Sequence, residues 1–506
     1  MMMDWLKQWS LYSPKAMALK EAESDVAYTY STLYYLSCRL ATRLREKFAV
    51  RSGDRVAVLA TNEIEYVVLF FALQRLDAIM VPVNFRLTAP EISHILRDSS
   101  PKALIHQKEF QAVLEKAEAS VVPDLKWLFD GDDSLTSFIA DEYARASTAF
   151  TSGSDWALPM EGTEDSPSMI LYTSGTTGAP KGALITKKML HWNSLNTTLR
   201  LNLSQNDISL GFAPFFHTGG WNVLLTPFMH RGACMILMRK FEPQKFLEIV
   251  AKEKVTLFFG VPTIMEMMAR APGFDSLDLS HVRYAIVGGE PMPVQLIKTW
   301  EKKNIPIRQG YGLTEFGPNV FSLNEEDSIR KIGSIGFPNF YIEARVVDNS
   351  DKEVSAGEIG ELVLRGPVCT PGYWNNPEAT AQTIKNGWLH TGDLVRRDSE
   401  GYFYVAGRKK EMYISGGENV YPVEIERVLS THKSIREVAV VGVPDPKWGE
   451  VGKAYVALKA GSQLSTEELV EFCATHLAKY KIPKQVAFLA ELPKGDSGKI
   501  LKRALL

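Results

Sequence analysis

Short apolar runs alternate with stretches of helical spacing along much of the chain, and this alternation is the feature that most constrains its fold. Strand-like runs lie at residues 55–60, 78–83, 102–106, 255–259 and 284–287. Helical spacing occurs at residues 63–76 and 90–98 and again after each of the last two runs. Strands that alternate with helices are typical of parallel sheets covered by helices. The sequence therefore predicts an α/β fold with mixed, mostly parallel sheets.

The pattern changes toward the C-terminus. Glycine and proline are frequent at residues 357–372, where residues 360–366 indicate short antiparallel strands. A charged run at residues 408–411 follows a strand predicted at residues 402–405, and beyond it the sequence predicts a helix, two strands and a helix, at residues 423–429, 435–443, 454–458 and 466–477. Because 506 residues are too many for one compact core, we expect two domains. They are a large N-terminal domain at residues 1–407 and a small, mobile α+β domain at residues 408–506.

Composition excludes several classes of function. A net charge of −2 gives no sign of a nucleic-acid-binding surface. The cysteines are scattered and form no CxxC pair, which argues against a metal cluster or a disulfide scaffold and favours a reducing compartment. The N-terminal residues lack the features of a signal peptide, and polar residues interrupt the most apolar stretch, residues 66–83. We therefore expect a cytoplasmic protein with no transmembrane segment.

A run of glycines and hydroxyl residues that ends in a lysine gives the first chemical signal. A strand predicted at residues 168–172 leads into Thr-Ser-Gly-Thr-Thr-Gly-Ala-Pro-Lys-Gly at residues 173–182. Glycine lets backbone N–H groups turn toward an anion, while hydroxyl groups and a lysine add donors and charge. Pro180 and Gly182 break the Walker A pattern, and the run is not a GxGxxG dinucleotide motif. The run predicts a phosphate-binding loop made of Thr173, Ser174, Gly175, Thr176, Thr177, Gly178 and Lys181.

This loop resembles the signature loop of the acyl-adenylate-forming (AMP-binding) superfamily. The resemblance extends from Gly-Asp-Arg-Val-Ala-Val at residues 53–58 to Gly498-Lys499, with the family's motifs in order. It implies an enzyme of the acyl- or aryl-CoA synthetase branch that uses ATP, Mg²⁺ and coenzyme A. Such an enzyme joins a carboxylic acid to AMP, releases pyrophosphate, and then transfers the acyl group to CoA. The resemblance assigns nucleotide and acid binding to residues 1–407, and the catalytic lysine and the CoA face to residues 408–506.

Residues 309–315 match the family's second core motif. Tyr311 offers a flat face for adenine, Thr314 can donate to the α-phosphate, and Glu315 is an oxygen ligand suited to Mg²⁺. In the family, the matching aspartate, here Asp393, accepts hydrogen bonds from both ribose hydroxyls, and the arginine matching Arg408 also reaches the ribose. The segment resembling the adenine pocket and the rest of the core motif complete the predicted AMP-binding set: Gly289, Glu290, Pro291, Gln309, Gly310 and Gly312.

The predicted C-terminal domain carries the residues that the resemblance assigns to catalysis and thioester formation. Lys499 resembles the lysine that offsets the repulsion between the carboxylate and the α-phosphate. Lys410 occupies the place of the family's hinge residue, about which the small domain rotates between the two steps. Gly416 and Gly417 resemble the motif that lines the pantetheine tunnel, and Trp448 lies in a segment like that of CoA ligases. Trp448 as a plain packing aromatic is an equally good interpretation.

The segment Pro-Phe-Phe-His-Thr-Gly-Gly-Trp at residues 214–221 indicates the class of acid. Amino-acid-activating relatives have an aspartate where this chain has His217, so a buried ammonium group would have no partner here. In acyl- and aryl-CoA ligases a histidine at this place sits beside the carboxylate, and a plain core histidine is a competing interpretation of His217. Trp221, apolar residues 223–225, Phe316 and Pro318 predict an apolar pocket. It suits a medium- or long-chain fatty acid or an aryl acid better than acetate.

Other functions remain open at this stage. A luciferase-like oxidase would carry a further lysine at the position of Ile414. A stand-alone adenylation enzyme would load a carrier protein instead of free CoA, and the Trp448 segment argues mildly against it. A non-catalytic nucleotide-binding relative would not need to retain four charged residues together: Lys181, Glu315, Asp393 and Lys499. The expected partners are small molecules and not nucleic acid, and a homodimer is one open assembly.

Overall fold

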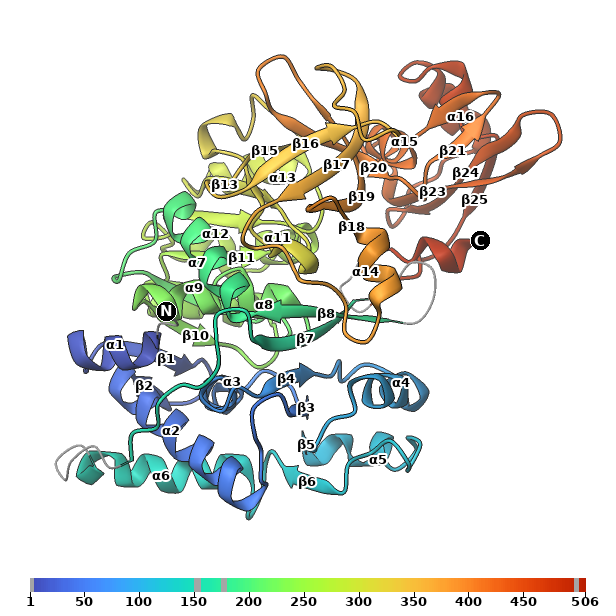
Figure 1. Cartoon of the computed structure of the whole chain (residues 1–506). Coiled ribbons are helices and arrows are strands. Elements are labelled where there is room, and N and C mark those ends of the chain that lie inside the picture. Colours follow the sequence, from blue (N-terminus) through green and yellow to red (C-terminus); the bar gives the residue numbers. More distant parts are fainter. Residues whose placement is uncertain (1–3, 150–155, 174–179, 496–499) are drawn as a thin grey trace. The chain divides into compact units, whose positions relative to one another are not determined.

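The computed structural model describes residues 4–149, 156–173, 180–495 and 500–506 (Figure 1). The chain forms two compact units. The large unit comprises Met1–Glu343 and Leu364–Leu389, and the small unit comprises Ala344–Val363 and His390–Leu506. The division by contacts thus assigns residues 344–363 and 390–407 to the small unit. The functional boundary that we expect at residue 408 stays a prediction.

The first sheet of the large unit has six strands, in the order β6-β5-β3-β4-β7-β8. Its members are β6 (Leu125–Leu128), β5 (Ala103–His106), β3 (Arg55–Leu59), β4 (Ile79–Pro82), β7 (Pro167–Thr173) and β8 (Lys181–Thr186). Neighbouring strands are parallel except β7 and β8, which are antiparallel. The short, continuously apolar runs of the sequence form the buried central strands, as expected for parallel strands covered on both faces.

The remaining strands of the large unit extend this parallel architecture. A second sheet has the order β2-β1-β10-β9, in which only β1 and β2 are antiparallel. Its strands are β2 (Ala27–Thr29), β1 (Met17–Glu21), β10 (Cys234–Leu237) and β9 (Ile208–Gly211). The parallel strands β11, β12 and β13 lead into antiparallel β14 and β15. Their bounds, with the short β18, are β11 (Leu257–Gly260), β12 (Tyr284–Val287), β13 (Ile307–Tyr311), β14 (Phe321–Ser322), β15 (Ser334–Pro338) and β18 (Ile384–Lys385).

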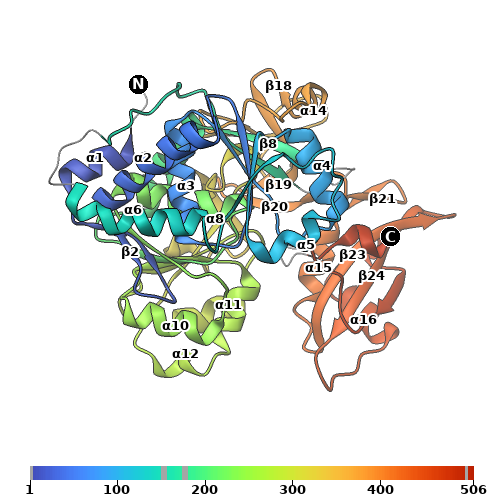
Figure 2. The ribbon, with the colours of Figure 1, turned by 90° about the horizontal axis from the view of Figure 1, so that it is seen from below.

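Helices cover these sheets. Those of the large unit are α1 (Trp5–Tyr12), α2 (Tyr30–Lys47), α3 (Ile64–Arg75), α4 (Ala89–Ser99), α5 (Gln111–Leu114), α6 (Leu135–Ala149), α7 (Lys187–Leu201), α8 (Thr218–Asn222), α9 (Leu225–Arg231), α10 (Pro243–Lys252), α11 (Pro262–Ala269), α12 (Gly273–Ser276), α13 (Val294–Glu301) and α14 (Pro377–Thr383), with 3-10 turns η1 (Lys108–Phe110), η2 (Thr314–Phe316) and η3 (Glu325–Asp327). Helix α2 packs against α1, α3 and α6, and Figure 2 shows these four helices gathered on one side of the unit. Local signals set the ends: α4 begins with a capping box formed by Thr88 and Glu91 and ends at Ser100 in the left-handed conformation.

The small unit combines two sets of strands. In the first set β16 (Glu343–Val347), β17 (Ile359–Arg365), β19 (Trp388–Arg397) and β20 (Phe403–Arg408) lie adjacent in the order β20-β19-β17-β16. The second is the sheet β22-β21-β24-β23, to which β25 adds parallel to β24. Its elements are β21 (Tyr413–Ser415), β22 (Glu418–Val420), α15 (Pro422–Leu429), β23 (Ile435–Asp445), β24 (Gly449–Leu458), α16 (Thr466–Ala474), η4 (Lys479–Lys481), β25 (Gln485–Phe488) and η5 (Lys502–Leu505).

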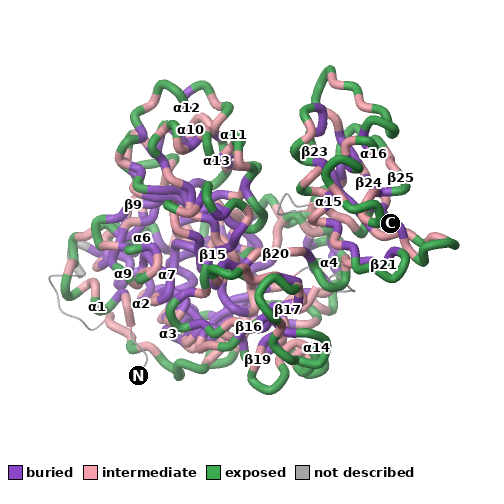
Figure 3. Tube along the Cα trace, turned by 90° about the horizontal axis from the view of Figure 1, so that it is seen from above, coloured by how far each residue is buried: buried purple, intermediate pink, exposed green. Residues whose placement is uncertain are grey.

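The α/β fold class predicted from the sequence is confirmed, including the helix–strand–strand–helix order of the small unit. Two local predictions were wrong. Residues 360–365 lie in one continuous strand, β17, instead of several short ones, and Gly366 follows it. Strand β20 continues to Arg408, because that residue pairs in register with Asp393 on β19. Figure 3 shows buried residues concentrated in the interior of the large unit. In the described part of the chain, no helix is long and apolar enough to cross a membrane.

Candidate active site

The ends of the predicted phosphate loop are fixed by the hairpin that carries it. Thr173 is the last residue of β7 and Lys181 the first of β8, and the two are register partners. The Thr173 hydroxyl donates to the carbonyl oxygen of Lys181 at 3.4 Å. The loop residues between them, Ser174, Gly175, Thr176, Thr177 and Gly178, lie outside the described residues. The hairpin therefore places both ends of the predicted anion-binding loop at one edge of the six-stranded sheet.

Tyr373, which the sequence did not single out, joins two predicted site residues. It forms an antiparallel bridge with Ala183, two residues after Lys181. Its hydroxyl donates to Glu315 Oε1 at 2.8 Å, and the ammonium nitrogen of Lys181 lies 5.5 Å from the centre of its ring. Burial and the nearby Glu315 carboxylate raise the pKa of the Tyr373 hydroxyl, so it stays a donor. Tyr373 thus contacts both Lys181 and Glu315, which lie 134 positions apart in the sequence.

A buried threonine holds this cluster in place. The Thr370 hydroxyl donates to the carbonyl oxygen of Leu184 at 2.7 Å and accepts from the backbone N–H of Gly372 at 3.1 Å. Its own backbone N–H donates to the carbonyl oxygen of Glu315 at 2.8 Å. The bonds to Leu184 and Glu315 tie the segment that carries Tyr373 to β8 and to the turn η2, whereas the bond from Gly372 lies within that segment. The cluster is therefore positioned by backbone contacts and not by the charged side chains alone.

The two segments assigned to adenine meet at the ends of β12 and β13. A Cβ on Gly288 would lie 3.6 Å from the carbonyl oxygen of Gly310, and the Gln309 side-chain oxygen accepts from the backbone N–H of Met292 at 3.4 Å. Gly289 has φ +86°, and Glu290 and Pro291 are exposed. Ligands in open α/β sheets bind at the carboxyl ends of parallel strands, where these residues lie.

The core motif continues in a tight turn. A Cβ on Gly312 would meet the carbonyl oxygen of Pro318 at 2.1 Å, so only glycine fits there. Tyr311 is half-buried and makes an edge contact with Phe321, with ring centres 5.8 Å apart. Thr314 is also half-buried, whereas Phe316 is buried in the interior. The turn presents Tyr311 and Thr314 together with Glu315.

In the small unit the two residues assigned to the ribose contact one another. The Arg408 Nε lies 2.7 Å from Asp393 Oδ1, and the two residues are register partners on β20 and β19. Asp393 is buried, and its backbone N–H donates to the Thr391 hydroxyl at 3.0 Å. Lys410, the predicted hinge, is exposed and follows β20 closely. Lys499 lies outside the described residues, but Lys494 and Ile500 on either side of its segment form an antiparallel bridge.

The residues assigned to CoA form one small surface in the small unit. Gly416 and Gly417 make the two-residue turn between β21 and β22, with φ +61° and φ +87°. Glycine is favoured at both positions because a two-residue hairpin of this kind needs positive φ. A Cβ on Gly416 would meet the Trp448 ring at 2.9 Å, and the Gly416 backbone N–H donates to the Trp448 carbonyl oxygen. The Trp448 side chain is 44% exposed, so it packs on the turn and still offers a face to a ligand.

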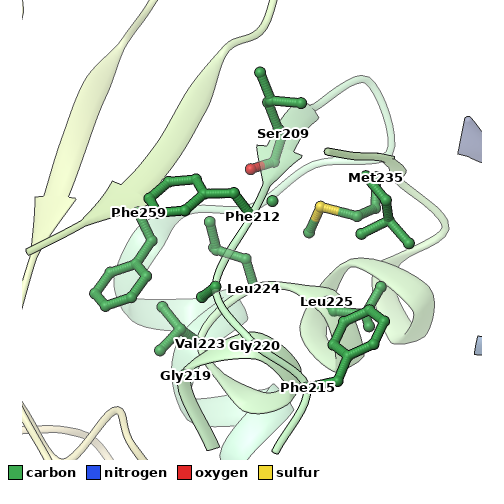
Figure 4. Close-up of a pocket in the computed structure, with 14 residues that line it drawn as sticks. Ser209, Phe212, Phe215, Gly219, Gly220, Val223, Leu224, Leu225, Met235 and Phe259 are labelled. Carbon is green, nitrogen blue, oxygen red and sulfur yellow. The ribbon is translucent and has the colours of Figure 1, made fainter. Parts of the chain in front are cut away.

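The segment that the sequence predicts to bind the acid, residues 214–221, lies beside a small apolar cavity in the large unit (Figure 4). His217 is exposed at the N-cap of α8, and its Nδ1 accepts from the backbone N–H of Gly219 at 3.0 Å. Asn62, another residue that sequence reasoning missed, binds the backbone of residues 213 and 215 and so holds the segment that leads to His217. Trp221 does not line the cavity: it is fully buried and stacked on Phe215 at 4.4 Å.

The cavity lining comes from β9, β10, β11, α8, the start of α9 and the segments that follow β9 and α8. It comprises Ser209, Leu210, Gly211, Phe212, Ala213, Phe215, Gly219, Gly220, Val223, Leu224, Leu225, Met235, Leu237 and Phe259. Apolar residues 223–225 lie here as the sequence predicts, whereas Phe316 and Pro318 do not line it. The carboxyl end of the strand at residues 255–259 was the one available signal for Phe259.

Together, the residues predicted to bind phosphate, adenine and ribose indicate a nucleotide-using enzyme. Comparison with known families identifies the group: the model described as "AMP-binding enzyme" matches residues 6–374, and "AMP-binding enzyme C-terminal domain" matches residues 424–499. The chain belongs to the family of AMP-binding enzymes.

Relatives in this family match nearly the whole chain. A feruloyl-CoA synthase of Amycolatopsis is 38% identical over 98% of this chain and 97% of its own length. A long-chain-fatty-acid–CoA ligase of Mycobacterium tuberculosis is 37% identical over 99% of this chain and 97% of its own. The solved O-succinylbenzoate CoA synthetase of Bacillus subtilis with ATP and magnesium is 30% identical, with a TM-score of 0.86 over 99% of both chains.

Proposed function

We propose that this chain is an ATP-dependent acid–CoA ligase. A carboxylate oxygen of the acid attacks the α-phosphorus of ATP, the bond to the β-phosphate oxygen breaks, and acyl-AMP and pyrophosphate form. The CoA thiol then attacks the acyl carbon, loses its proton and releases AMP. The observation that carries the proposal is the contact of Tyr373 with both Lys181 and Glu315, since it joins the phosphate loop to the acidic motif. The named relatives are ligases of acids to CoA.

Each predicted site residue has a separate role in this reaction. Lys181 and the loop N–H groups bind phosphate, and Tyr311 stacks on adenine at the strand ends. Asp393 accepts hydrogen bonds from the ribose, oriented by its ion pair with Arg408. Lys499 supplies positive charge where the carboxylate meets the α-phosphate, which offsets the repulsion between the two anions.

Glu315 fits a Mg²⁺ ion that is bound mainly by ATP. Among the described residues no cluster of three or more His, Cys, Asp or Glu side chains could hold a metal. Mg²⁺ typically takes one or two protein carboxylates and completes its shell with phosphate and water oxygens. One carboxylate beside a phosphate loop is therefore sufficient. Glu315 Oε1 is fixed by the Tyr373 hydroxyl, which orients that carboxylate. Bound there, Mg²⁺ would neutralise phosphate charge.

The small unit serves the second step in this proposal. The Gly416–Gly417 turn with Trp448 offers bare backbone and an aromatic face to the pantetheine arm of CoA. Lys410 is the pivot that changes backbone angles between the two steps. The four cysteines are free thiols, which supports a reducing, cytoplasmic setting. The partners are ATP, CoA and a small acid. Light scattering tests whether the chain is a homodimer.

The acid is a fatty or an aryl acid. His217 lies beside the carboxylate, and the cavity receives the apolar part of the acid. The test is a pyrophosphate-release assay over straight-chain and aryl acids, with and without CoA, followed by product analysis. We expect acid-dependent release and an acyl-CoA product. Acyl-AMP formation with no transfer to free CoA would instead favour loading of a carrier protein, and no release with any acid would contradict the ligase assignment.

A further inference from the structure

One buried hydroxyl in the acid cavity has no hydrogen-bond partner within the described part of the chain. Among the residues that line the cavity, Ser209 carries the one side-chain oxygen, and there is no side-chain nitrogen. Its residue is fully buried, and within the described part of the chain the Ser209 Oγ makes no hydrogen bond. A buried hydroxyl that lacks a partner is uncommon in folded proteins, because its burial costs free energy. Figure 4 shows this oxygen among apolar side chains.

Strand register places the hydroxyl on the cavity side of the sheet. Ser209 on β9 is the register partner of Met235 on β10, and Gly211 is the partner of Leu237. Register partners on neighbouring strands point to the same face. Met235 and Leu237 pack with the core that contains Phe215, whereas Leu210, between Ser209 and Gly211, packs with the core on the opposite face. Ser209 Oγ therefore faces the cavity.

The cavity is small. It encloses about 20 Å³, which is room for about one water-sized group. Gly211 leaves part of this room, because a Cβ there would lie 3.2 Å from the Met235 sulfur. A long alkyl chain would need side chains to move apart, whereas a hydroxyl group on a ring that lies at the edge of the cavity would fill only this volume.

The other side of the cavity adjoins the residues assigned to the carboxylate and to adenine. A Cβ on Gly219 would lie 3.1 Å from His217 Nδ1 and 3.6 Å from the Phe259 ring. The same ring lies 3.5 Å from a Cβ built on Gly288. His217 therefore lies beside the wall of the cavity that holds Ser209, which places a carboxylate bound near His217 next to this cavity.

We propose that Ser209 is a specificity residue that hydrogen-bonds a polar substituent at the far end of an aryl acid. This inference rests on the ligase function proposed above and narrows its substrate to aryl acids with a ring hydroxyl group. Ser209 positions and selects the acid and takes no part in bond making or breaking.

The experiment compares pyrophosphate release by the full-length enzyme with para-hydroxycinnamate, para-methylcinnamate and straight-chain decanoate. The hydroxyl and methyl acids have nearly the same shape and differ in hydrogen bonding. One net hydrogen bond gives a preference of about five- to tenfold in kcat/KM for the hydroxyl acid. In Ser209→Ala this ratio falls to about one, while kcat/KM for the methyl acid is unchanged or higher, since a buried unpaired hydroxyl is removed.

Ser168→Ala is the matched control. Ser168 is also fully buried with no hydrogen bond to its hydroxyl within the described chain, but it lies on β7 and does not line the cavity. It should keep the wild-type ratio, and thermal melting of both variants checks that they are folded.

The outcomes separate this inference from the ligase function. A wild-type ratio near one, which a cavity filled only by water would give, overturns it without the need for any variant. A ratio that persists in Ser209→Ala also overturns it. Release with decanoate and not with the aryl acids leaves the ligase function standing and rejects the aryl class. No release with any acid rejects both.

Discussion

Two regions of the large unit differ in whether their polar side chains have hydrogen-bond partners. In the cluster of Lys181, Tyr373 and Glu315, the Tyr373 hydroxyl donates to Glu315 and the Lys181 ammonium group lies over the Tyr373 ring, while Thr370 ties the cluster to the backbone. In the cavity beside β9, the hydroxyl of Ser209 faces apolar side chains and has no partner within the described chain. The first region is organised before any ligand arrives. The second depends on what binds.

This difference agrees with what the relatives have in common. They match the chain over nearly its full length, yet their names specify feruloyl, long-chain fatty and O-succinylbenzoyl groups. We therefore expect the internally bonded cluster to serve the nucleotide reaction that the relatives share, and the cavity to serve the acid in which they differ. Substitutions in the first region should therefore lower the rate of adenylation with every acid, and those in the second should change which acids are activated fastest.

The largest expected effect belongs to the nucleotide side. Lys499→Ala should lower acyl-AMP formation by about 10²–10³-fold, typical of the loss of one preorganised charged donor. Thioester formation from supplied acyl-AMP should be nearly unchanged. Single-turnover assays of each half-reaction measure both effects, and the loss should be the same for every acid tested. Equal losses in the two half-reactions would show that Lys499 does not act specifically in adenylation.

The next effect belongs to the acid side. Phenylalanine should be activated at least about 10²-fold more slowly than phenylpropanoate, because burying an ammonium group without a carboxylate partner costs several kcal/mol. The lining of the cavity contains no acidic side chain. Pyrophosphate release with the matched pair of acids measures the ratio. Faster release with the amino acid would contradict the assignment of His217 to a plain carboxylate pocket.

Sequence alone predicted the elements of both regions better than their contacts. The strand at residues 284–287 was placed with the bounds that the structure shows, because a short apolar run carries its own signal. Tyr373 was missed because its role depends on a bridge to Ala183, far away in the chain. Trp221 was assigned to the acid pocket from its neighbours in sequence, whereas its ring is stacked on Phe215 in the core. Periodicity reports which face is buried and not which residues share a cavity.

A smaller effect is expected on the Mg²⁺ dependence of adenylation, which tests how Tyr373 orients the Glu315 carboxylate. Glu315→Gln should raise the Mg²⁺ concentration for half-maximal adenylation by about tenfold, because a neutral amide is a weaker Mg²⁺ ligand. Tyr373→Phe keeps the carboxylate but removes its donor, and should shift the Mg²⁺ requirement in the same direction by less. Glu266→Gln, an exposed change on α11, is the control. Unchanged Mg²⁺ dependence in Glu315→Gln would remove Glu315 from the metal site.

The smallest effect compares the two kinds of buried hydroxyl directly. Thr370→Val keeps the shape of the side chain but leaves the N–H of Gly372 without its acceptor, and should destabilise the fold by about 1–3 kcal/mol. Ser209→Ala removes a hydroxyl that has no partner within the described chain, and should leave stability between unchanged and about 1 kcal/mol higher. Urea denaturation of the full-length chain without ligands measures both free energies of unfolding. Equal destabilisation by the two variants would mean that Ser209 Oγ is satisfied in the free enzyme. A loss of stability confined to Thr370→Val would show that the hydrogen bonds that position the cluster of Lys181, Tyr373 and Glu315 contribute to the stability of the fold, whereas the Ser209 hydroxyl does not.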